Sequence, residues 1–256
     1  MALKKQSKPA LITGRQPVME ALRAGQSIER IFMSRSAGGT VVHQLRDLAR
    51  QYGVPVHMVP EEKLNRLHPA RRSGTIRDQG CIAVVSKVAF LDLQAVISHV
   101  VESGAVPLFL LIDGVTDVRN IGAMARSAWC CGVQALVLPQ KGVAALNEEA
   151  VKSSAGALEH LSVCRVADLQ EAVSLLRLNG FQIIASAADG QVALQDCDFS
   201  GPTALIMGSE DVGVQPALLK AAHQTFRIPM ATDFDSFNVS VATGIILYEA
   251  MKQRGF

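Results

Sequence analysis

Three polar segments of the chain, each directly after an apolar run, carry side chains whose types and spacing could do chemistry. The first extends from Asp113 to Arg126, follows the apolar residues 108–112, and contains Asn120. A carboxylate, an amide and a guanidinium in one crevice can orient a hydroxyl group and bind a phosphate by hydrogen bonds. Asn120 also suits the N-cap of the helix predicted to follow, and capping alone would explain an asparagine there.

The second and third polar segments follow later apolar runs. One extends from Gly208 to Gly213, and the other begins at Ile228 and leads through Ser236 and Asn238 into the last predicted helix. Glycines in such loops allow positive φ and the close approach of a ligand to bare backbone. Capping of the last helix is again the structural alternative for the serine and the asparagine. The candidate residues of the two segments are Gly208, Glu210, Gly213, Ile228, Met230, Ser236, Phe237 and Asn238.

The elements predicted from the pattern of apolar residues divide the chain into two parts. In the first part, helices and strands alternate over 15–24, 29–33, 40–52, 55–59, 61–67 and 81–85. In the second part, helical patterns alternate with strands near 108–112, 134–138, 161–164, 182–186, 203–207 and 225–228. This alternation predicts an α/β fold with a parallel sheet and helices on both of its faces. The predicted domains are residues 1–87, a linker and first helix over 88–106, and residues 107–256.

The predicted topology brings the polar segments to one edge of the second sheet. Ligands of an open α/β sheet bind beyond the carboxyl ends of its strands, and each polar segment follows a strand. Neither G-x-G-x-x-G nor the P-loop pattern occurs in the chain, although a dinucleotide-binding domain would carry the former after an early strand. A dinucleotide-dependent oxidoreductase is therefore disfavoured, and the glycines after late strands offer a different cradle for a cofactor.

Composition limits the classes of protein to which the chain can belong. Of its 256 residues, 49% are hydrophobic and 19% are charged, which predicts a folded protein with a buried core. No apolar run approaches the ~20 residues that span a bilayer, so no membrane association is expected. Residues 1–9 form a basic tail without the apolar stretch of a secretory signal. The five cysteines contain no C-x-x-C pair, so we expect no metal site and a cytoplasmic location.

Charge is distributed unevenly between the two parts. Residues 1–100 hold 15 Lys and Arg against 7 Asp and Glu, a net charge of +8, whereas residues 101–256 hold 10 against 16, a net charge of −6. This asymmetry predicts that the first part binds a polyanion and that the second part carries the catalytic site, although chance could also produce it. A loop containing glycine and serine favours RNA, because its basic residues can follow a phosphate backbone. These residues are Arg66, Arg71, Arg72 and Arg77.

Together, the three segments resemble the motifs of the SpoU (TrmH-type) family of RNA 2′-O-ribose methyltransferases, within the SPOUT class. The family patterns are D-x-x-x-D-x-x-N-x-G-x-x-x-R, G-x-E-x-x-G and I-P-M followed by S-x-N-V-S-V-A, and the chain matches them in this order over residues 113–242. Residues 14–22 and 79–83 also resemble the substrate-binding domain of the ribosomal members. The resemblance covers nearly the whole chain and is closest to the 23S rRNA guanosine-2′-O-methyltransferases.

The resemblance implies a fold, a cofactor and partners. It implies a small L30e-like domain that binds the substrate, followed by a SPOUT domain in which the chain forms a deep trefoil knot around S-adenosylmethionine. It also implies a homodimer that pairs through the knotted domain and acts on structured RNA, most of all rRNA, and not on DNA. A tRNA methyltransferase and a catalytically inactive RNA-binding protein of the same fold are the alternatives.

Methyl transfer to a ribose hydroxyl depends chiefly on holding the oxygen and the methyl group in a near-attack geometry. The resemblance gives Arg126 a catalytic role, and we expect it to clamp a phosphate and orient the hydroxyl, because a guanidinium keeps its proton. Asn120 and Asn238 are expected to anchor this array, and Glu210 to orient loops or Arg126, with Ser236 in the same crevice. The expected cofactor residues are Gly208, where an added side chain would meet the cofactor, together with Gly213, Ile228, Met230 and Phe237.

Overall fold

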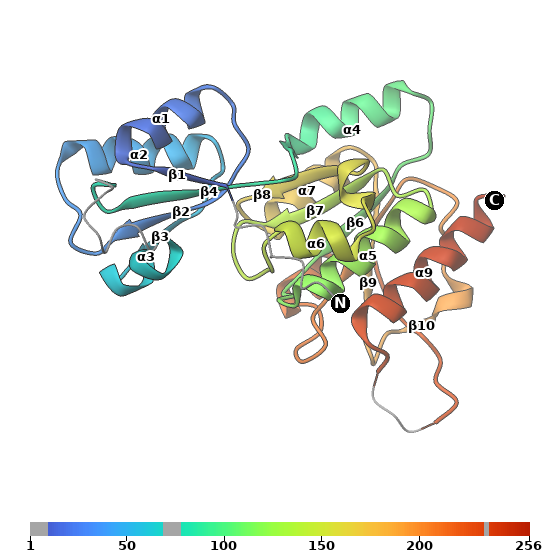
Figure 1. The fold of residues 1–256 in the computed structure, drawn as a ribbon. Coiled ribbons are helices and arrows are strands. Elements are labelled where there is room, and N and C mark those ends of the chain that lie inside the picture. Colours follow the sequence, from blue (N-terminus) through green and yellow to red (C-terminus); the bar gives the residue numbers. More distant parts are fainter. Residues whose placement is uncertain (1–9, 69–77, 233–235) are drawn as a thin grey trace, which may run out of the picture. The chain divides into compact units, whose positions relative to one another are not determined.

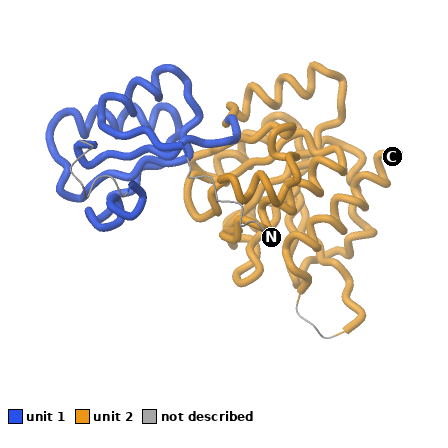
Figure 2. The backbone as a smooth tube through the Cα atoms, viewed as in Figure 1, with its two compact units in different colours: residues 1–89 blue, residues 90–256 orange. Residues whose placement is uncertain are grey.

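The computed structural model of the chain describes residues 10–68, 78–232 and 236–256. Contacts between residues group the chain into two compact units, residues 1–89 and 90–256, which Figure 2 shows in blue and orange. The division falls between Ala89 and Phe90, and residues 90–106 belong to the second unit. The domain bounds at 87 and 107 stay a prediction from the sequence.

The first unit is built on a four-stranded mixed sheet with the strand order β1-β4-β2-β3. Strand β4 is antiparallel to β1 and β2, and β2 is parallel to β3. Every element predicted here is present, and the short strand β1 is an addition. The elements are β1 (Leu11–Thr13), α1 (Arg15–Arg23), β2 (Ile28–Ser34), α2 (Thr40–Gln51), β3 (Val56–Val59), α3 (Glu61–Leu67) and β4 (Cys81–Val85).

The sheet of the first unit has apolar side chains on both faces. Helices α1 and α2 pack on one face, where Leu22 and Leu45 are buried with Ile31 of β2. Helix α3 packs on the other face, where Leu64 is buried with Phe32. The two faces follow from the alternation of side chains along β2, because successive residues of a strand point to opposite faces of the sheet.

The second unit is built on an eight-stranded sheet with the order β10-β12-β9-β11-β6-β7-β8-β5, and all its strand pairs are parallel. The α/β fold with a parallel sheet is thereby confirmed, and the short strands β5 and β10 are additions. The strands are β5 (Phe90–Leu91), β6 (Leu108–Ile112), β7 (Ala135–Pro139), β8 (Ser162–Val166), β9 (Gln182–Ser186), β10 (Val192–Ala193), β11 (Thr203–Met207) and β12 (Gln224–Arg227).

Helices cover both faces of this sheet (Figure 1). One core contains side chains of α4, α7 and α8 with alternate strand residues such as Phe109 and Ile206. The residues between them, such as Leu110 and Leu205, point to the opposite face, where α5 packs against α6 and α9. The helices are α4 (Leu93–Glu102), α5 (Val118–Cys130), α6 (Glu148–Ser153), α7 (Leu169–Leu178), α8 (Pro216–Ala221) and α9 (Val239–Gln253).

Gly122 allows α5 and α6 to pack closely. A Cβ at this position would overlap with the Ser153 hydroxyl and would lie 2.7 Å from the Ala150 carbonyl oxygen, both on α6. The glycine of the first motif is therefore required by helix packing, whether or not a ligand is bound. It sits on the same helix as Asn120 and Arg126, so this packing fixes the helix that carries both.

Arg254 anchors the end of α9 to two loops that precede central strands. Its guanidinium donates hydrogen bonds to the carbonyl oxygens of Val106 and Pro107, just before β6, and to those of Phe199 and Gly201, just before β11. Partial burial lowers the pKa of this guanidinium. Asn238 is the N-cap of α9, so the anchor at Arg254 fixes the helix whose other end carries a motif residue.

Other features of the fold bear on the predicted class of protein. No helix among the described residues is long and apolar enough to cross a membrane. The described residues also contain no group of three or more His, Cys, Asp or Glu side chains that could hold a metal ion. All five cysteines are free, and burial raises the pKa of the Cys81 and Cys164 thiols to about 12.

Candidate active site at the carboxyl edge of the second sheet

The polar segments meet where the direction of the chain through the sheet reverses. From β6 the chain adds β7 and β8 on one side, and it then returns to place β9 and β11 on the other side of β6. In such sheets the crevice between the two neighbouring strands at the reversal binds ligands. Here the neighbours are β6, which leads into the first motif, and β11, which leads into the second.

Asp113 joins the loops after these two strands. Its carboxylate is buried and accepts hydrogen bonds from the Gln215 backbone N–H at 2.7 Å and from the Gln215 side-chain amide at 2.6 Å. Its own backbone N–H donates to the carbonyl oxygen of Met207, at the end of β11. Asp113 therefore fixes the start of the first loop against the end of the second and is not itself available to a substrate.

Asp117 caps α5, and the sequence-based interpretation of Asn120 as the N-cap is wrong. The Asp117 carboxylate accepts hydrogen bonds from the backbone N–H groups of Arg119 and Asn120, at 2.7 and 3.4 Å. Its side-chain hydrogen bond with Arg119, followed by the backbone bonds, lowers its pKa. The helix thus begins one residue after Asp117, and the side chain of Asn120 is left to reach across to the second and third motifs.

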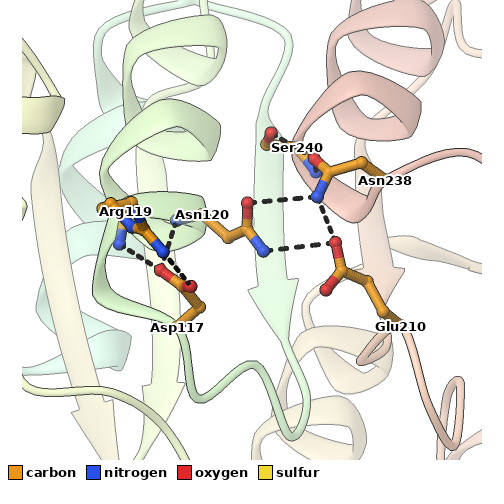
Figure 3. A network of polar contacts seen from close by, with 6 residues as sticks. All are labelled: Asp117, Arg119, Asn120, Glu210, Asn238 and Ser240. Carbon is orange, nitrogen blue, oxygen red and sulfur yellow. Dashed lines mark hydrogen bonds and ion pairs between the residues drawn. The ribbon is translucent and has the colours of Figure 1, made fainter.

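Asn120, Glu210 and Asn238 form one network of polar contacts (Figure 3). The Glu210 Oε1 atom accepts hydrogen bonds from the side-chain amides of Asn120, at 3.2 Å, and Asn238. It also accepts a bond at 3.2 Å from the backbone N–H of Val239, in the first turn of α9. The Asn238 amide donates in addition to the Asn120 Oδ1 atom at 3.3 Å. The structure therefore brings one predicted residue of each motif together.

Ser240 fixes the orientation of the Asn238 amide, and the sequence-based analysis did not single it out. The backbone N–H and the hydroxyl of Ser240 both donate to Asn238 Oδ1, at 3.0 and 2.6 Å. With its oxygen held by two donors, the amide must present its NH₂ group to Asn120 and Glu210. A serine two residues after an N-cap asparagine was the available signal, because a hydroxyl there can reach the capping side chain.

Arg126 lies beside this network and not within it. It is exposed on α5 and lines an open hollow of about 720 Å³ between α5 and α9, the Arg126 hollow. No hydrogen bond or ion pair to another described residue holds its guanidinium, and the expected contact with Glu210 is not among the bonds of that carboxylate. The hollow is also lined by Ser127, Ser240, Val241, Ile245 and Tyr248.

Gly208 is required because the protein's own backbone leaves no room for a side chain there. The expected reason was a different one, namely that an added side chain would meet the cofactor. A Cβ at Gly208 would overlap with the backbone of Gly213 and Val214, at the other end of the same loop. The loop is folded back on itself, with the Gly213 N–H bonded to the Ser209 carbonyl oxygen at 2.9 Å. A larger residue at this position would disrupt the loop before it met any ligand.

The remaining candidates flank the same edge of the sheet. Ile228 and Met230 follow β12 and are partly buried, and Phe237 is partly exposed two residues before α9. Ser236 is exposed beside it. Since Glu210 bonds Asn238 and Val239, the loop after β11 lies against the segment that contains Phe237.

A loop that the sequence-based analysis missed lies between these segments. Strand β9 sits between β11 and β12 in the sheet, so residues 187–190, which follow β9, lie between the loops that follow those two strands. A Cβ at Gly190 would overlap with the backbone of Phe226, and the Arg227 guanidinium donates to the Gly190 carbonyl oxygen at 2.6 Å. Gly190 could have been found from the sequence, because it follows an apolar strand just as Gly208 of the second motif does.

The basic loop predicted in the first unit is described only in part. Arg66 is exposed in the last turn of α3. Residues 71, 72 and 77, which carry the other three arginines, lie outside the described residues.

Comparison with known protein families shows the family to which a chain with this site belongs. Residues 107–248 match the model of the SpoU rRNA Methylase family, which is more than half of the chain. The chain belongs to the SpoU family. Residues 11–91 match a second model, that of the RNA 2′-O ribose methyltransferase substrate-binding domain. The predictions of the family, of an RNA methyltransferase and of a substrate-binding unit joined to a SPOUT unit are confirmed, while the trefoil knot stays a prediction.

Individual relatives cover nearly all of this chain or about two thirds of it. An uncharacterized tRNA/rRNA methyltransferase of Synechocystis is 34% identical over 248 residues, which cover 96% of this chain and 63% of that protein. The SpoU methyltransferase AviRb from Streptomyces viridochromogenes, solved in complex with the cofactor AdoMet, is 25% identical and covers 96% of this chain and 91% of its own, with a TM-score of 0.59. The TrmH/SpoU tRNA modifying enzyme of A. aeolicus is 30% identical and covers 63% of this chain and 84% of its own, with a TM-score of 0.53.

Ser240→Ala should lower turnover in RNA methyl transfer about three- to tenfold, because the Asn238 amide loses one of two bonds that orient it. Ser240→Thr keeps the hydroxyl and should retain most of the turnover. The measurement is kcat at saturating RNA for both variants and the wild type. Unchanged kcat in Ser240→Ala would show that the orientation of this amide does not limit the reaction.

Proposed function

We propose that the chain transfers a methyl group from S-adenosylmethionine to a ribose 2′-hydroxyl of RNA, at a guanosine of 23S rRNA. The observation that carries this proposal is the network of Asn120, Glu210 and Asn238. It takes one polar side chain from each of three segments and places them at the ligand-binding edge of the sheet. A protein that only bound RNA would have no need to hold these amides in one orientation.

The loops at this edge fit S-adenosylmethionine. Phe237, Ile228 and Met230 keep apolar surface exposed to solvent there, which suits the faces of an adenine ring. The described residues leave open space beside Gly213, where backbone can approach a ligand. These residues and Gly208 would hold the cofactor. When bound, it supplies an electrophilic methyl group on a sulfonium.

The side chains of this chain then have separate tasks. The Arg126 guanidinium clamps a phosphate of the RNA and orients the attacking hydroxyl, since a planar fork binds phosphate through two parallel bonds. Asn120 and Asn238 are held in place by Glu210 and present fixed dipoles to the bound groups. Ser236 lies exposed beside them and offers a further hydroxyl to the substrate. Glu210 acts through the two asparagines and is a positioning residue.

The first unit supplies affinity for structured RNA. Its net charge of +8 over residues 1–100 suits the phosphate backbone, and residues 11–91 match the substrate-binding model of the family. The family whose model matches residues 107–248 is described as the SpoU rRNA Methylase family, and this description supports rRNA over tRNA as the substrate. The proposal includes a cytoplasmic location, where an enzyme of this kind would meet its RNA.

The second unit is proposed to form a homodimer through α5 and α9. Val241 and Tyr248 of α9 are 50% and 60% exposed and line the Arg126 hollow together with the partly buried Ile245. An apolar lining around an open hollow of about 720 Å³ suits a self-complementary contact between two copies. A second copy would then lie close to Arg126 and to the RNA bound there.

Arg126→Ala should abolish methylation and leave cofactor binding nearly intact, because Arg126 acts on the RNA. Mass mapping of ribose methylation in cells without this protein should show one missing site in 23S rRNA and none in tRNA. The wild type and Arg177→Ala, an exposed arginine of α7, should restore the site, and Arg126→Ala and Arg126→Lys should not. A missing site in tRNA instead, or restoration by Arg126→Ala, would contradict the proposal, and calorimetry of Arg126→Ala with S-adenosylmethionine tests the cofactor affinity.

The double variant Val241→Glu/Tyr248→Glu should be monomeric, because four charges would be buried in the contact between two copies. Sedimentation equilibrium at micromolar concentration measures the mass, and the wild type should sediment as a dimer. Leu178→Glu provides the matched control, since Leu178 is an apolar residue of α7 that is 86% exposed. A dimer that survives the double variant would place the interface elsewhere.

A further inference from the structure

Gln79, in the first unit, has a backbone conformation that residues other than glycine rarely adopt. Its φ is +50°, and Gln79 and Ala155 are the two non-glycine residues with positive φ among the described parts of the chain. Such conformations persist where the surrounding structure imposes them, and they cluster at functional sites. The side chain of Gln79 is exposed, so packing of this side chain does not explain why a glutamine and not a glycine occupies this position.

Hydrogen bonds on both sides of Gln79 hold this conformation. The buried Asp78 accepts a bond from the Gly80 N–H at 3.0 Å through its carboxylate and one from the Cys81 N–H at 2.9 Å through its carbonyl oxygen. The Gly80 carbonyl oxygen accepts a bond from the Ser34 N–H at 2.7 Å. The Arg15 guanidinium donates to the carbonyl oxygen of Gln79 itself at 3.0 Å. The turn is therefore fixed by its own Asp78, by Ser34 of β2 and by Arg15 of α1.

Arg15 also joins this turn to a third loop. Strands β1 and β2 are both antiparallel to β4, so the ends of β1 and β2 and the start of β4 lie at one edge of the sheet. Arg15, directly after Gly14, donates a second bond to the Gly38 carbonyl oxygen at 3.2 Å, in the loop after β2. The exposed Arg35 is in the same loop. We call Arg15, Arg35 and Gln79 the Gln79 rim.

The Gln79 rim suits a polyanion that also carries hydrogen-bonding groups, as the bases of RNA do. Arg15 uses two of its five N–H donors on carbonyl oxygens. Neither Arg15 nor Arg35 forms an ion pair with a carboxylate of the described residues, so both guanidinium groups keep N–H donors for a further partner. Two cations beside one exposed amide match the backbone phosphates and base edges of an unpaired RNA segment, whose bases a side-chain amide can hydrogen-bond. A glycine at position 79 would adopt the same φ without strain but would present no amide.

We propose that Gln79 hydrogen-bonds a base of the RNA substrate, in an unpaired loop or bulge, while Arg15 and Arg35 bind the adjacent phosphates. This inference rests on the proposed function, because it takes RNA to be the substrate. It assigns recognition to an uncharged residue of the first unit, where the sequence-based analysis pointed to arginines. The turn fixes the backbone of Gln79 before RNA arrives, so the exposed side chain starts from a defined position.

The test compares variants of the full chain in binding unmodified 23S rRNA made by transcription in vitro. Gln79→Gly removes the amide and relieves the backbone, so the thermal midpoint should stay at or above that of the wild type while RNA affinity falls about tenfold. The dependence of affinity on salt should keep its slope, since no charge is lost. Arg35→Gln should weaken binding and reduce that slope by roughly one. Gln51→Ala, which removes an exposed amide at the far end of α2, is the matched control and should bind as the wild type does.

Wild-type affinity in Gln79→Gly would overturn the proposal, and so would a fall in affinity accompanied by a lower thermal midpoint, which would indicate a structural role. A failure of the proposed function is recognised separately, because the wild type would then not methylate 23S rRNA. If the wild type methylates 23S rRNA and Gln79→Gly does so with equal kcat/KM, the function stands and the role of Gln79 falls.

Discussion

The site depends on one carboxylate oxygen that accepts three hydrogen bonds. Glu210 Oε1 is bonded to the Asn120 amide, the Asn238 amide and the Val239 N–H. These donors lie 90, 28 and 29 residues away in the sequence, in two different helices. A charged acceptor forms stronger hydrogen bonds than a neutral one, so a single glutamate can hold both helix starts at the edge of the sheet. Without it, only the bond from the Asn238 amide to Asn120 Oδ1 would join the two asparagines.

The rest of the second unit brings the glutamate to this position. Strand β11 is inserted next to β6, which places the loops after the two strands side by side. The buried Asp113 then bonds Gln215. Gly208 permits the tight fold of the loop that leads from β11 to Gln215. Residues of the family pattern at positions 113, 122 and 208 thus act on backbone and packing. The residues at positions 120, 210 and 238 form the polar network, and Arg126 remains free to meet the substrate.

Most strands and helices could be predicted from the sequence, because apolar runs and their periods report burial directly. Strand β1 was missed, since three residues are too short for a period. Asn120 was taken for a cap because cap preferences do not distinguish it from Asp117, which lies three residues earlier. Ser240 and the loop after β9 were missed because their roles depend on contacts between distant segments. Gln79 belongs to a segment that the resemblance already named, but its positive φ could not be predicted, because a backbone angle of this kind leaves no mark in the sequence.

The central claim is that Glu210 positions the two asparagines and does not accept the proton of the ribose hydroxyl. The most direct measurement is the pH dependence of single-turnover methyl transfer to 23S rRNA by the wild type and by Glu210→Gln. The glutamine keeps one acceptor oxygen but loses the charge, so we predict that the rate falls about tenfold at every pH, with the shape of the profile unchanged. A wild-type rate that rises through the acidic range, with this rise absent in Glu210→Gln, would identify the carboxylate as the base and contradict the account.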